Sequence, residues 1–240
     1  MVFEDTPVIC GHRGAGAGPG ENTLPSFLAA VDAGLGWVEV DVRLTAGGEL
    51  VAHHDPLPAS DGAGLLRIET LLDGLPPHVA VDFDLKSALE DALRPRGATT
   101  AARLADLAAA EAARRRVLVT SFDPAALLIV RERAPGVPLG LLTLGAAPLR
   151  QAVAAAAHLG VHVLGPEVRA LQGERELARC VAVAHEAGLQ VAAWCPRLRE
   201  AGELVAAGVD CLIVDDVSLG AVAASRAGRP RAGSRTPRRS

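Results

Sequence analysis

Aromatic and amide side chains are scarce in this sequence. The chain of 240 residues has no tyrosine, only four phenylalanines and two tryptophans, and a single lysine, Lys86. Asn22 is likewise its only asparagine. Because half of the residues are apolar, valine, leucine, isoleucine and alanine must form the core. A chain that uses arginine almost everywhere but keeps one lysine is expected to need a compact ammonium group there.

No stretch of the chain has the features of a cysteine metal motif, a signal peptide or a membrane span. The cysteines Cys10, Cys180, Cys195 and Cys211 show neither CxxC pairing nor metal-ligand spacing, so we expect ordinary thiols in a reducing compartment. No basic and apolar leader precedes the first predicted strand. No run approaches the ~20 apolar residues of a membrane span. These absences predict a cytoplasmic protein without stable membrane insertion.

The net charge of −4 is unevenly distributed along the chain. The segment from Ser225 to Ser240 holds six of the 24 basic residues and no acid, so the body keeps 18 basic and 28 acidic residues, a balance of −10. An acidic body predicts no nucleic-acid partner. The Arg-rich tail is predicted to be disordered, either as a solvated terminus or as a weak tether to polyanions or anionic lipids. We therefore predict one domain over residues 1–224 and a tail over 225–240.

Apolar, β-branched runs alternate with stretches rich in alanine and leucine. The predicted strands are Pro7–Gly11, Trp37–Leu44, Val79–Leu85, Val117–Ser121, Pro138–Leu142, Val161–Leu164, Gln190–Trp194 and Cys211–Val214. The predicted helices are Thr23–Ala33, Ile68–Leu72, Ser87–Arg115, Pro124–Arg133, Pro148–Leu159, Gly173–Ala187 and Arg199–Ala207. Alternating βα units predict a parallel sheet with right-handed crossovers. Eight strands in roughly 220 residues favour a closed (β/α)8 TIM barrel over an open doubly wound sheet, which would bring a dinucleotide-type glycine loop that is absent here.

One predicted strand, Leu50–His54, does not fit this count. It follows Trp37–Leu44 after only five residues, which is too short for a parallel crossover. We therefore predict an antiparallel hairpin centred near Gly47. The hairpin is expected to bring His54 roughly opposite Asp41.

The first predicted strand delivers His12 and Arg13 to its end. An imidazole that moves protons beside a guanidinium that binds oxygens is a suitable pair for phosphate. Glu39 and Asp41 lie two residues apart on the next strand, so their side chains share a face. An acid pair inside a barrel is costly unless it binds a cation, which predicts a hard divalent metal. An exposed edge strand is the alternative.

The segment from Asp82 to Lys86 repeats this pattern, because Asp82, Asp84 and Lys86 share one side of a strand. Asp84 could complete a three-carboxylate site, with Lys86 at its mouth to neutralise an anionic substrate. An ordinary amphipathic strand with an internal ion pair is the alternative. Of His53 and His54 only one can face this site, and the alternation does not say which. His12 and His54 at neighbouring strand ends would suit an acid and a base on opposite sides of a phosphorus atom.

Taken together, these residues resemble a known family. Over about residues 7–219 the chain is similar to the glycerophosphodiester phosphodiesterases, which belong to the PI-PLC-like phosphodiesterase superfamily of TIM barrels. The motifs that carry the resemblance are His12-Arg13-Gly14, Glu21-Asn22-Thr23, Glu39-Val40-Asp41, His54-Asp55, Asp84-Leu85-Lys86, Ser121-Phe122-Asp123, Trp194 and Gly208-Val209-Asp210.

The resemblance implies a site and a reaction. A divalent cation, Mg²⁺ or Ca²⁺, would be held by Glu39, Asp41 and Asp84. His12 and His54 would be the general acid and base, Arg13 and Lys86 would bind the phosphate, and Trp194 would line the pocket. The implied partner is a small-molecule glycerophosphodiester, cleaved to glycerol 3-phosphate and an alcohol. Nothing in the sequence predicts an oligomeric state.

Three departures from the family pattern bear on substrate choice. Asp84 stands where the family usually has glutamate, although enzymes resembling the spider-venom sphingomyelinases use aspartate there. The insertion after His54-Asp55 is reduced to Pro56–Leu66, and Cys195 replaces the usual threonine. Alternatives at this point are a lysophospholipase D-like or sphingomyelinase D-like enzyme, a catalytically silent phosphodiester-binding barrel, and an unrelated metal-dependent lyase or aldolase.

Overall fold

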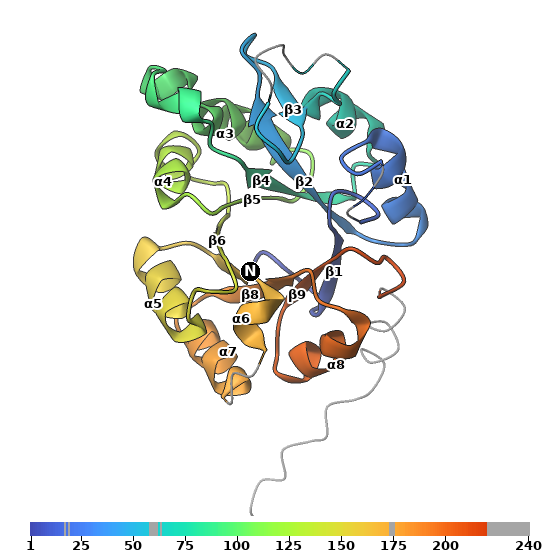
Figure 1. Cartoon of the computed structure of the whole chain (residues 1–240), viewed down its shortest axis with the longest axis vertical. Coiled ribbons are helices and arrows are strands. Elements are labelled where there is room, and N and C mark those ends of the chain that lie inside the picture. The colour runs from blue at the N-terminus through green and yellow to red at the C-terminus, as the bar shows by residue number, and fades with distance from the viewer. Residues whose placement is uncertain (17, 19, 58–61, 63, 173–175, 220–240) are drawn as a thin grey trace, which may run out of the picture.

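Eight parallel strands close into a barrel (Figure 1). The computed structural model describes residues 1–16, 18, 20–57, 62, 64–172 and 176–219. The barrel strands are β1 (Val8–Gly11), β2 (Trp37–Leu44), β4 (Ala80–Leu85), β5 (Val117–Ser121), β6 (Leu139–Thr143), β7 (Val163–Pro166), β8 (Gln190–Trp194) and β9 (Cys211–Val214). Because β1 pairs with both β2 and β9, the eight parallel strands form a closed ring, and the predicted (β/α)8 barrel is confirmed.

Helices cover the outside of the barrel (Figure 1). They are α1 (Leu24–Asp32), α2 (Ile68–Gly74), α3 (Thr100–Glu111), α4 (Pro124–Arg133), α5 (Leu149–Leu159), α6 (Val168–Leu171), α7 (Leu177–Glu186) and α8 (Leu198–Ala206), with short 3₁₀ turns η1 (Leu89–Ala92) and η2 (Arg96–Ala98). Of these, α6 was not predicted. The prediction of α7 started at Gly173, and residues 173–175 lie outside the described part of the chain.

The predicted continuous helix from Ser87 to Arg115 is wrong. Its alanine and leucine content is typical of a helix, but Pro95 interrupts the segment and α3 begins only at Thr100. The Thr99 hydroxyl caps α3 by accepting from Ala102 N. The Asp91 carboxylate accepts from the backbone N–H groups of Ala88 and Thr100. These side-chain bonds to the backbone stabilise a turn in place of continuous helix.

Side chains alternate between two cores along the strands. Outward residues such as Val40 and Phe83 pack with the helices in the larger hydrophobic cluster. Inward residues near the strand starts, including Trp37 and Leu118, form a smaller cluster with Phe3. Gln190 accepts from Val2 N and Phe3 N and donates to Phe3 O. The N-terminal segment thereby closes the floor of the barrel.

The strand β3 (Leu50–Ala52) pairs with β2 in antiparallel fashion outside the barrel, as the hairpin prediction requires. Its register differs by one residue from the prediction. Val42 pairs with Ala52, and His53 N donates to Asp41 O over 3.1 Å. His53, not His54, therefore lies opposite Asp41. The following residue, His54, is the one that reaches the cavity described below.

Arg115 is a buried charge that ties α3 to the segment after α2. Its side chain is fully buried, pairs with Glu111 and donates to the carbonyl oxygens of Leu72, Leu75, Pro76 and Val79. Removing one partner of a buried pair leaves an uncompensated charge and costs about 3–5 kcal/mol. We therefore expect Arg115→Ala to lower the free energy of unfolding by about that amount in urea denaturation.

The neighbouring Arg114 provides the matched control. Its side chain is 53% exposed and its ion pairs with Glu111 and Asp73 are long, so Arg114→Ala should change the free energy of unfolding by only about 0–1 kcal/mol. Equal effects of the two substitutions would contradict this assignment.

Within the described residues, the longest helices are too short and too polar to cross a bilayer. The predicted tail, Ser225–Ser240, lies outside the described part of the chain. The division into a domain and a tail at residue 225 therefore stays a prediction.

Candidate active site

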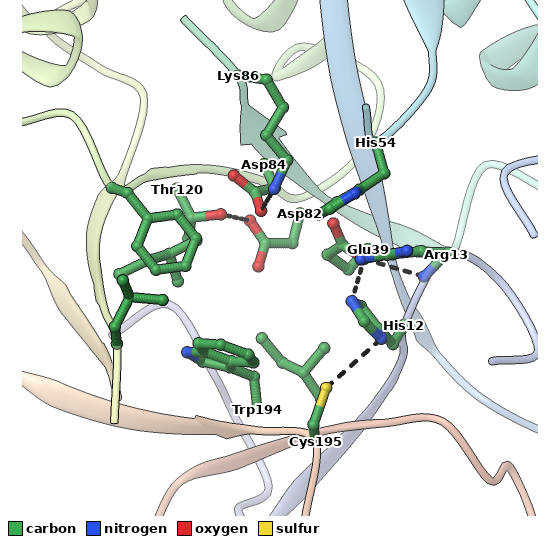
Figure 2. Close-up of a pocket in the computed structure, with 14 residues that line it drawn as sticks. His12, Arg13, Glu39, His54, Asp82, Asp84, Lys86, Thr120, Trp194 and Cys195 are labelled. Atoms are coloured by element: carbon green, nitrogen blue, oxygen red, sulfur yellow. Dashed lines mark hydrogen bonds and ion pairs between the residues drawn. The ribbon is translucent and has the colours of Figure 1, made fainter. Parts of the chain in front are cut away.

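The carboxyl ends of the strands surround a cavity of about 220 Å³. Figure 2 shows polar side chains from the β1, β2 and β4 ends on one side and Trp194 on the other. The lining residues are His12, Arg13, Glu39, His54, Asp82, Asp84, Lys86, Thr120, Phe122, Leu142, Leu144, Trp194, Cys195 and Ile213. Active sites of (β/α)8 barrels lie at this end.

Three carboxylates converge at the polar side of the cavity. Asp41 and Asp84 are register partners on the adjacent strands β2 and β4, and Glu39 lies one inward position before Asp41. All three residues are buried, and each offers an oxygen within 4.8 Å of those of the other two. Asp82, the register partner of Glu39, instead accepts a hydrogen bond from the Thr120 hydroxyl over 2.9 Å.

Burial and mutual repulsion shift the pKa values of these acids. Burial raises the pKa of Glu39, and the charges of Asp41 and Asp84 raise it further. Burial likewise raises the pKa of Asp84 above its usual value despite the opposing effect of Lys86. Burial also acts to raise the pKa of Asp41, but Lys86 and Arg13 outweigh it and hold that pKa below its ordinary range.

Two of the carboxylate oxygens lack a donor. Glu39 Oε1 and Asp84 Oδ1 are buried and have no hydrogen-bond partner within the described part of the chain. A buried charged oxygen without a partner is costly. A hard divalent cation prefers oxygen ligands of this kind, so the residues present fit a metal ion held by Glu39, Asp41 and Asp84.

The only lysine, Lys86, contacts the carboxylate cluster. Lys86 Nζ lies 2.9 Å from Asp41 Oδ1 and also pairs with Asp84 Oδ2. It sits 5.6 Å from the centre of the Phe122 ring. Burial lowers the pKa of Lys86, but the three neighbouring carboxylates raise it above the ordinary value. The ammonium group is therefore charged, next to the predicted metal ligands.

Arg13 and Asn22 contact Glu39 and Asp41. Both adopt left-handed backbone conformations, with φ of 52° and 54°. Arg13 N donates to Glu39 Oε2 over 2.9 Å, and its Nε lies 3.1 Å from Asp41 Oδ2. Asn22 Nδ2 donates to Asp41 Oδ2 over 2.8 Å, and Asn22 Oδ1 accepts from Asp41 N. Sequence reasoning missed this positioning function of Asn22, although its being the only asparagine was a signal.

The two predicted histidines flank Glu39 in Figure 2. His12 Nε2 lies 3.8 Å from Glu39 Oε2, and His12 Nδ1 lies 2.5 Å from Asp215 Oδ1. Burial lowers the pKa of His12, but the hydrogen bond that its ring makes to the Asp215 carboxylate and the contact with Cys195 outweigh this effect and raise the pKa to about 9. His54 is more exposed, and its Nδ1 lies 2.9 Å from Asp55 Oδ1. The contact of Asp215 with His12 was not predicted.

The opposite wall is apolar. Trp194 donates from Nε1 to Gly165 O over 3.1 Å and meets Phe122 edge to face, with ring centres 5.8 Å apart. Leu142 and Leu144 complete this wall, and Leu144 is 59% exposed. Trp194 therefore lines the cavity as predicted, whereas the two leucines were not anticipated because their sequence context shows no motif.

The fold and the cavity together define a (β/α)8 barrel with acids and imidazoles around a cavity at the strand ends. Comparison with known proteins specifies the class. The model of the glycerophosphoryl diester phosphodiesterase family matches residues 12–86 and 75–219. The chain belongs to this family, which confirms the resemblance seen in the motifs. Its activity is the hydrolysis of glycerophosphodiesters, and the unrelated lyase or aldolase alternative is excluded.

One relative is similar to the chain in sequence, and two solved structures are similar to it in fold. The chain is 30% identical over 210 residues, covering 71% of this chain and 76% of the relative, to a Mycobacterium tuberculosis protein named "Probable glycerophosphodiester phosphodiesterase 1". The barrel resembles a solved Oleispira antarctica phosphodiesterase in complex with the product sn-glycerol-3-phosphate, with 21% identity, TM-score 0.73, and coverage of 91% and 97% of the two chains. A glycerophosphodiester phosphodiesterase from Thermotoga maritima gives 22% identity, TM-score 0.69, and coverage of 90% and 97%.

Proposed function

We propose that the chain hydrolyses glycerophosphodiesters to glycerol 3-phosphate and an alcohol in a metal-dependent reaction, with His12 and His54 as general acid and base. The observation that carries the proposal is the inward cluster of Glu39, Asp41 and Asp84. Glu39 lies between the two imidazoles in Figure 2, and Glu39 Oε1 and Asp84 Oδ1 have no donor within the described residues.

The metal site in this proposal is Mg²⁺ or Ca²⁺ held by the three carboxylates. When bound, such an ion offsets negative charge that develops on the phosphoryl oxygens. The cationic side chains of Arg13 and Lys86 lie at the same cluster and are proposed to orient the substrate phosphate. Fixed charges in a partly buried site stabilise the transition state more than they would in water.

The histidines divide the proton transfers between them. His54 takes the proton of the attacking hydroxyl as its oxygen bonds to phosphorus. When water attacks, the product is glycerol 3-phosphate directly; when the substrate's glycerol hydroxyl attacks, the product is a cyclic phosphate, which a water molecule then opens to glycerol 3-phosphate. His12 gives its proton to the alcohol oxygen as the bond from that oxygen to phosphorus breaks. The raised pKa of His12, about 9, keeps this proton available at neutral pH. Asp215 and Asp55 orient the two rings through their Nδ1 atoms, and such orientation is needed for efficient proton transfer.

A coupled assay for glycerol 3-phosphate tests the proposal. We expect release from glycerophosphocholine or glycerophosphoethanolamine with Mg²⁺ or Ca²⁺, and loss of the release when EDTA removes the ion. Readdition of the ion is the control for irreversible damage. Full turnover in EDTA would contradict the metal dependence, and failure on every glycerophosphodiester and lysophospholipid would contradict the enzyme assignment.

A second candidate is a lysophospholipase D-like activity with a lipid-sized leaving group. It is favoured by the apolar wall, because Phe122 and Leu144 are exposed beside Trp194 where a longer chain could lie. Comparison of kcat/KM for lysophosphatidylcholine and glycerophosphocholine separates the two candidates. A higher value for the lysolipid, reduced by Leu144→Ser, would favour the second.

A further inference from the structure

Three potential metal donors stand at the ends of neighbouring strands, next to the carboxylate cluster. His12, Cys195 and Asp215 are each the first residue after β1, β8 and β9. These three strands are adjacent in the barrel. His12 N donates to Val214 O over 3.0 Å, and Cys195 N donates to Ile213 O over 2.9 Å. These hydrogen bonds to the last two residues of β9 thus fix the backbone positions of His12 and Cys195.

The donor atoms of these residues face one another. His12 Nδ1 lies 2.5 Å from Asp215 Oδ1 and 3.7 Å from Cys195 Sγ, and the three donor atoms all lie within 4.8 Å of one another. Figure 2 shows the Cys195 sulfur directed at the His12 ring. In tetrahedral zinc sites, with bonds of about 2.3 Å to sulfur and about 2.0–2.2 Å to nitrogen and oxygen, sulfur and nitrogen ligands stand about 3.6 Å apart.

The sulfur and nitrogen atoms are thus already placed for a tetrahedral ion. The carboxylate must move away from the ring by less than about 1 Å to reach the roughly 3.4 Å that two such ligands require. The Asp215 side chain is 44% exposed and can make this shift. Cys195 has a φ of 55°, a left-handed conformation that is strained in a residue with a Cβ atom and is found mainly where the surroundings enforce it.

The chemistry of this set differs from that of the carboxylate cluster. One imidazole, one thiolate and one carboxylate select zinc, whereas oxygen-only sites suit Mg²⁺ and Ca²⁺. The cysteines show no metal-ligand spacing in the sequence, because such spacing describes ligands from one local motif. Here 183 residues separate Cys195 from His12, and only the closure of the barrel brings them together.

We propose that His12 Nδ1, Cys195 Sγ and the Asp215 carboxylate form a Zn²⁺ site distinct from the carboxylate site. Binding releases the thiol proton and the Nδ1 proton to solvent. An imidazole ligated through Nδ1 carries its one proton on Nε2 and takes up no second proton. Provided that His12 is the acid of the proposed function, Zn²⁺ therefore inhibits hydrolysis.

The site is tested first without any assay of activity. The full chain, kept reduced and saturated with Mg²⁺, is titrated with Co²⁺ as a spectroscopic substitute for Zn²⁺. We expect one equivalent to produce the near-ultraviolet charge-transfer absorption that requires a thiolate ligand, and Zn²⁺ to abolish it. Cys195→Ser should lack this absorption, whereas Cys180→Ser, which removes a buried thiol of α7, should retain it. An absent absorption in the unmodified chain, or its persistence in Cys195→Ser, would overturn the proposal.

Affinity and activity supply the second measurement. We expect Cys195→Ser and Cys195→Thr to weaken Zn²⁺ binding by more than about 100-fold, because loss of an outer-shell partner alone costs roughly 10–100-fold. Asp215→Asn should also weaken it, and circular dichroism verifies that each variant is folded. In excess Mg²⁺, Zn²⁺ should inhibit the unmodified chain and the Cys180→Ser control. It should inhibit each Cys195 variant far less, when the rate with Zn²⁺ is compared with the rate of the same variant without Zn²⁺. Equal inhibition of all variants contradicts the site, while thiolate absorption in a chain without any hydrolase activity contradicts only the proposed function.

Discussion

His12→Ala and His54→Ala should each lower kcat by about 10²–10⁴-fold, which is the usual contribution of a positioned general acid or base. The two imidazoles act together in one displacement at phosphorus, one as base and one as acid, so the double variant should be little worse than either single one. The measurement is glycerol 3-phosphate release at saturating metal ion. KM should change less than kcat, because neither imidazole is proposed to bind the phosphate charge.

His53 provides the matched control for this prediction. It is the same residue type, one position away, and its backbone N–H pairs with Asp41 O on β2. It is not among the residues that line the cavity in the described part of the chain. His53→Ala should therefore leave kcat nearly unchanged. A loss as large as that of His54→Ala would show that the hairpin presents the other imidazole in solution.

Glu39→Gln should abolish both turnover and metal binding without lowering the stability of the metal-free chain. Burial and the charges of Asp41 and Asp84 raise the pKa of Glu39, so the carboxylate is destabilised until a cation offsets the repulsion. A neutral amide of the same size relieves that repulsion and still accepts the hydrogen bond from Arg13 N. It replaces an anionic ligand with a weaker one, and hard cations favour carboxylates.

Thermal unfolding separates the two effects. For the unmodified chain, metal at about 100 times its Kd should add about 2.7 kcal/mol, which corresponds to a rise in Tm of roughly 5–10 °C for a domain of this size. Glu39→Gln should show an equal or higher Tm without metal, and little rise with it. Asp84→Glu, which restores the family's usual acid, is the control and should keep the metal-dependent rise. A full rise in Glu39→Gln would remove this residue from the metal site.

Local sequence patterns were sufficient for most strands and for the inward direction of the carboxylates. The limits of β2, β5, β8 and β9 agree with prediction to the residue, because each strand is a run of apolar or alternating apolar residues. The segment from Ser87 to Arg115 was predicted wrongly, because the hydrogen bonds of Asp91 and Thr99 outweigh helix propensity there.

Within the site, too, local patterns predicted some features and missed others. Alternation along β2 and β4 predicted that Glu39, Asp41 and Asp84 share one side, which the register confirms. Alternation alone did not say which of two adjacent histidines enters the cavity, because that depends on the hairpin register and hence on how the turn closes. Nor could it show that Lys86 pairs with two of the carboxylates, since side-chain rotamers are chosen by tertiary packing.

The sequence by itself therefore determined the barrel, the inward acids, the position of His12 and Arg13 at the end of the first strand, and the family. Only the tertiary structure decided that His54 reaches the cavity, that Asn22 holds Asp41, and that Cys195 and Asp215 meet His12. The physical reason is the distance along the sequence over which each effect acts. Side-chain alternation is set by the local backbone, whereas contacts between residues nearly 200 positions apart exist only because β1 closes the barrel against both β2 and β9.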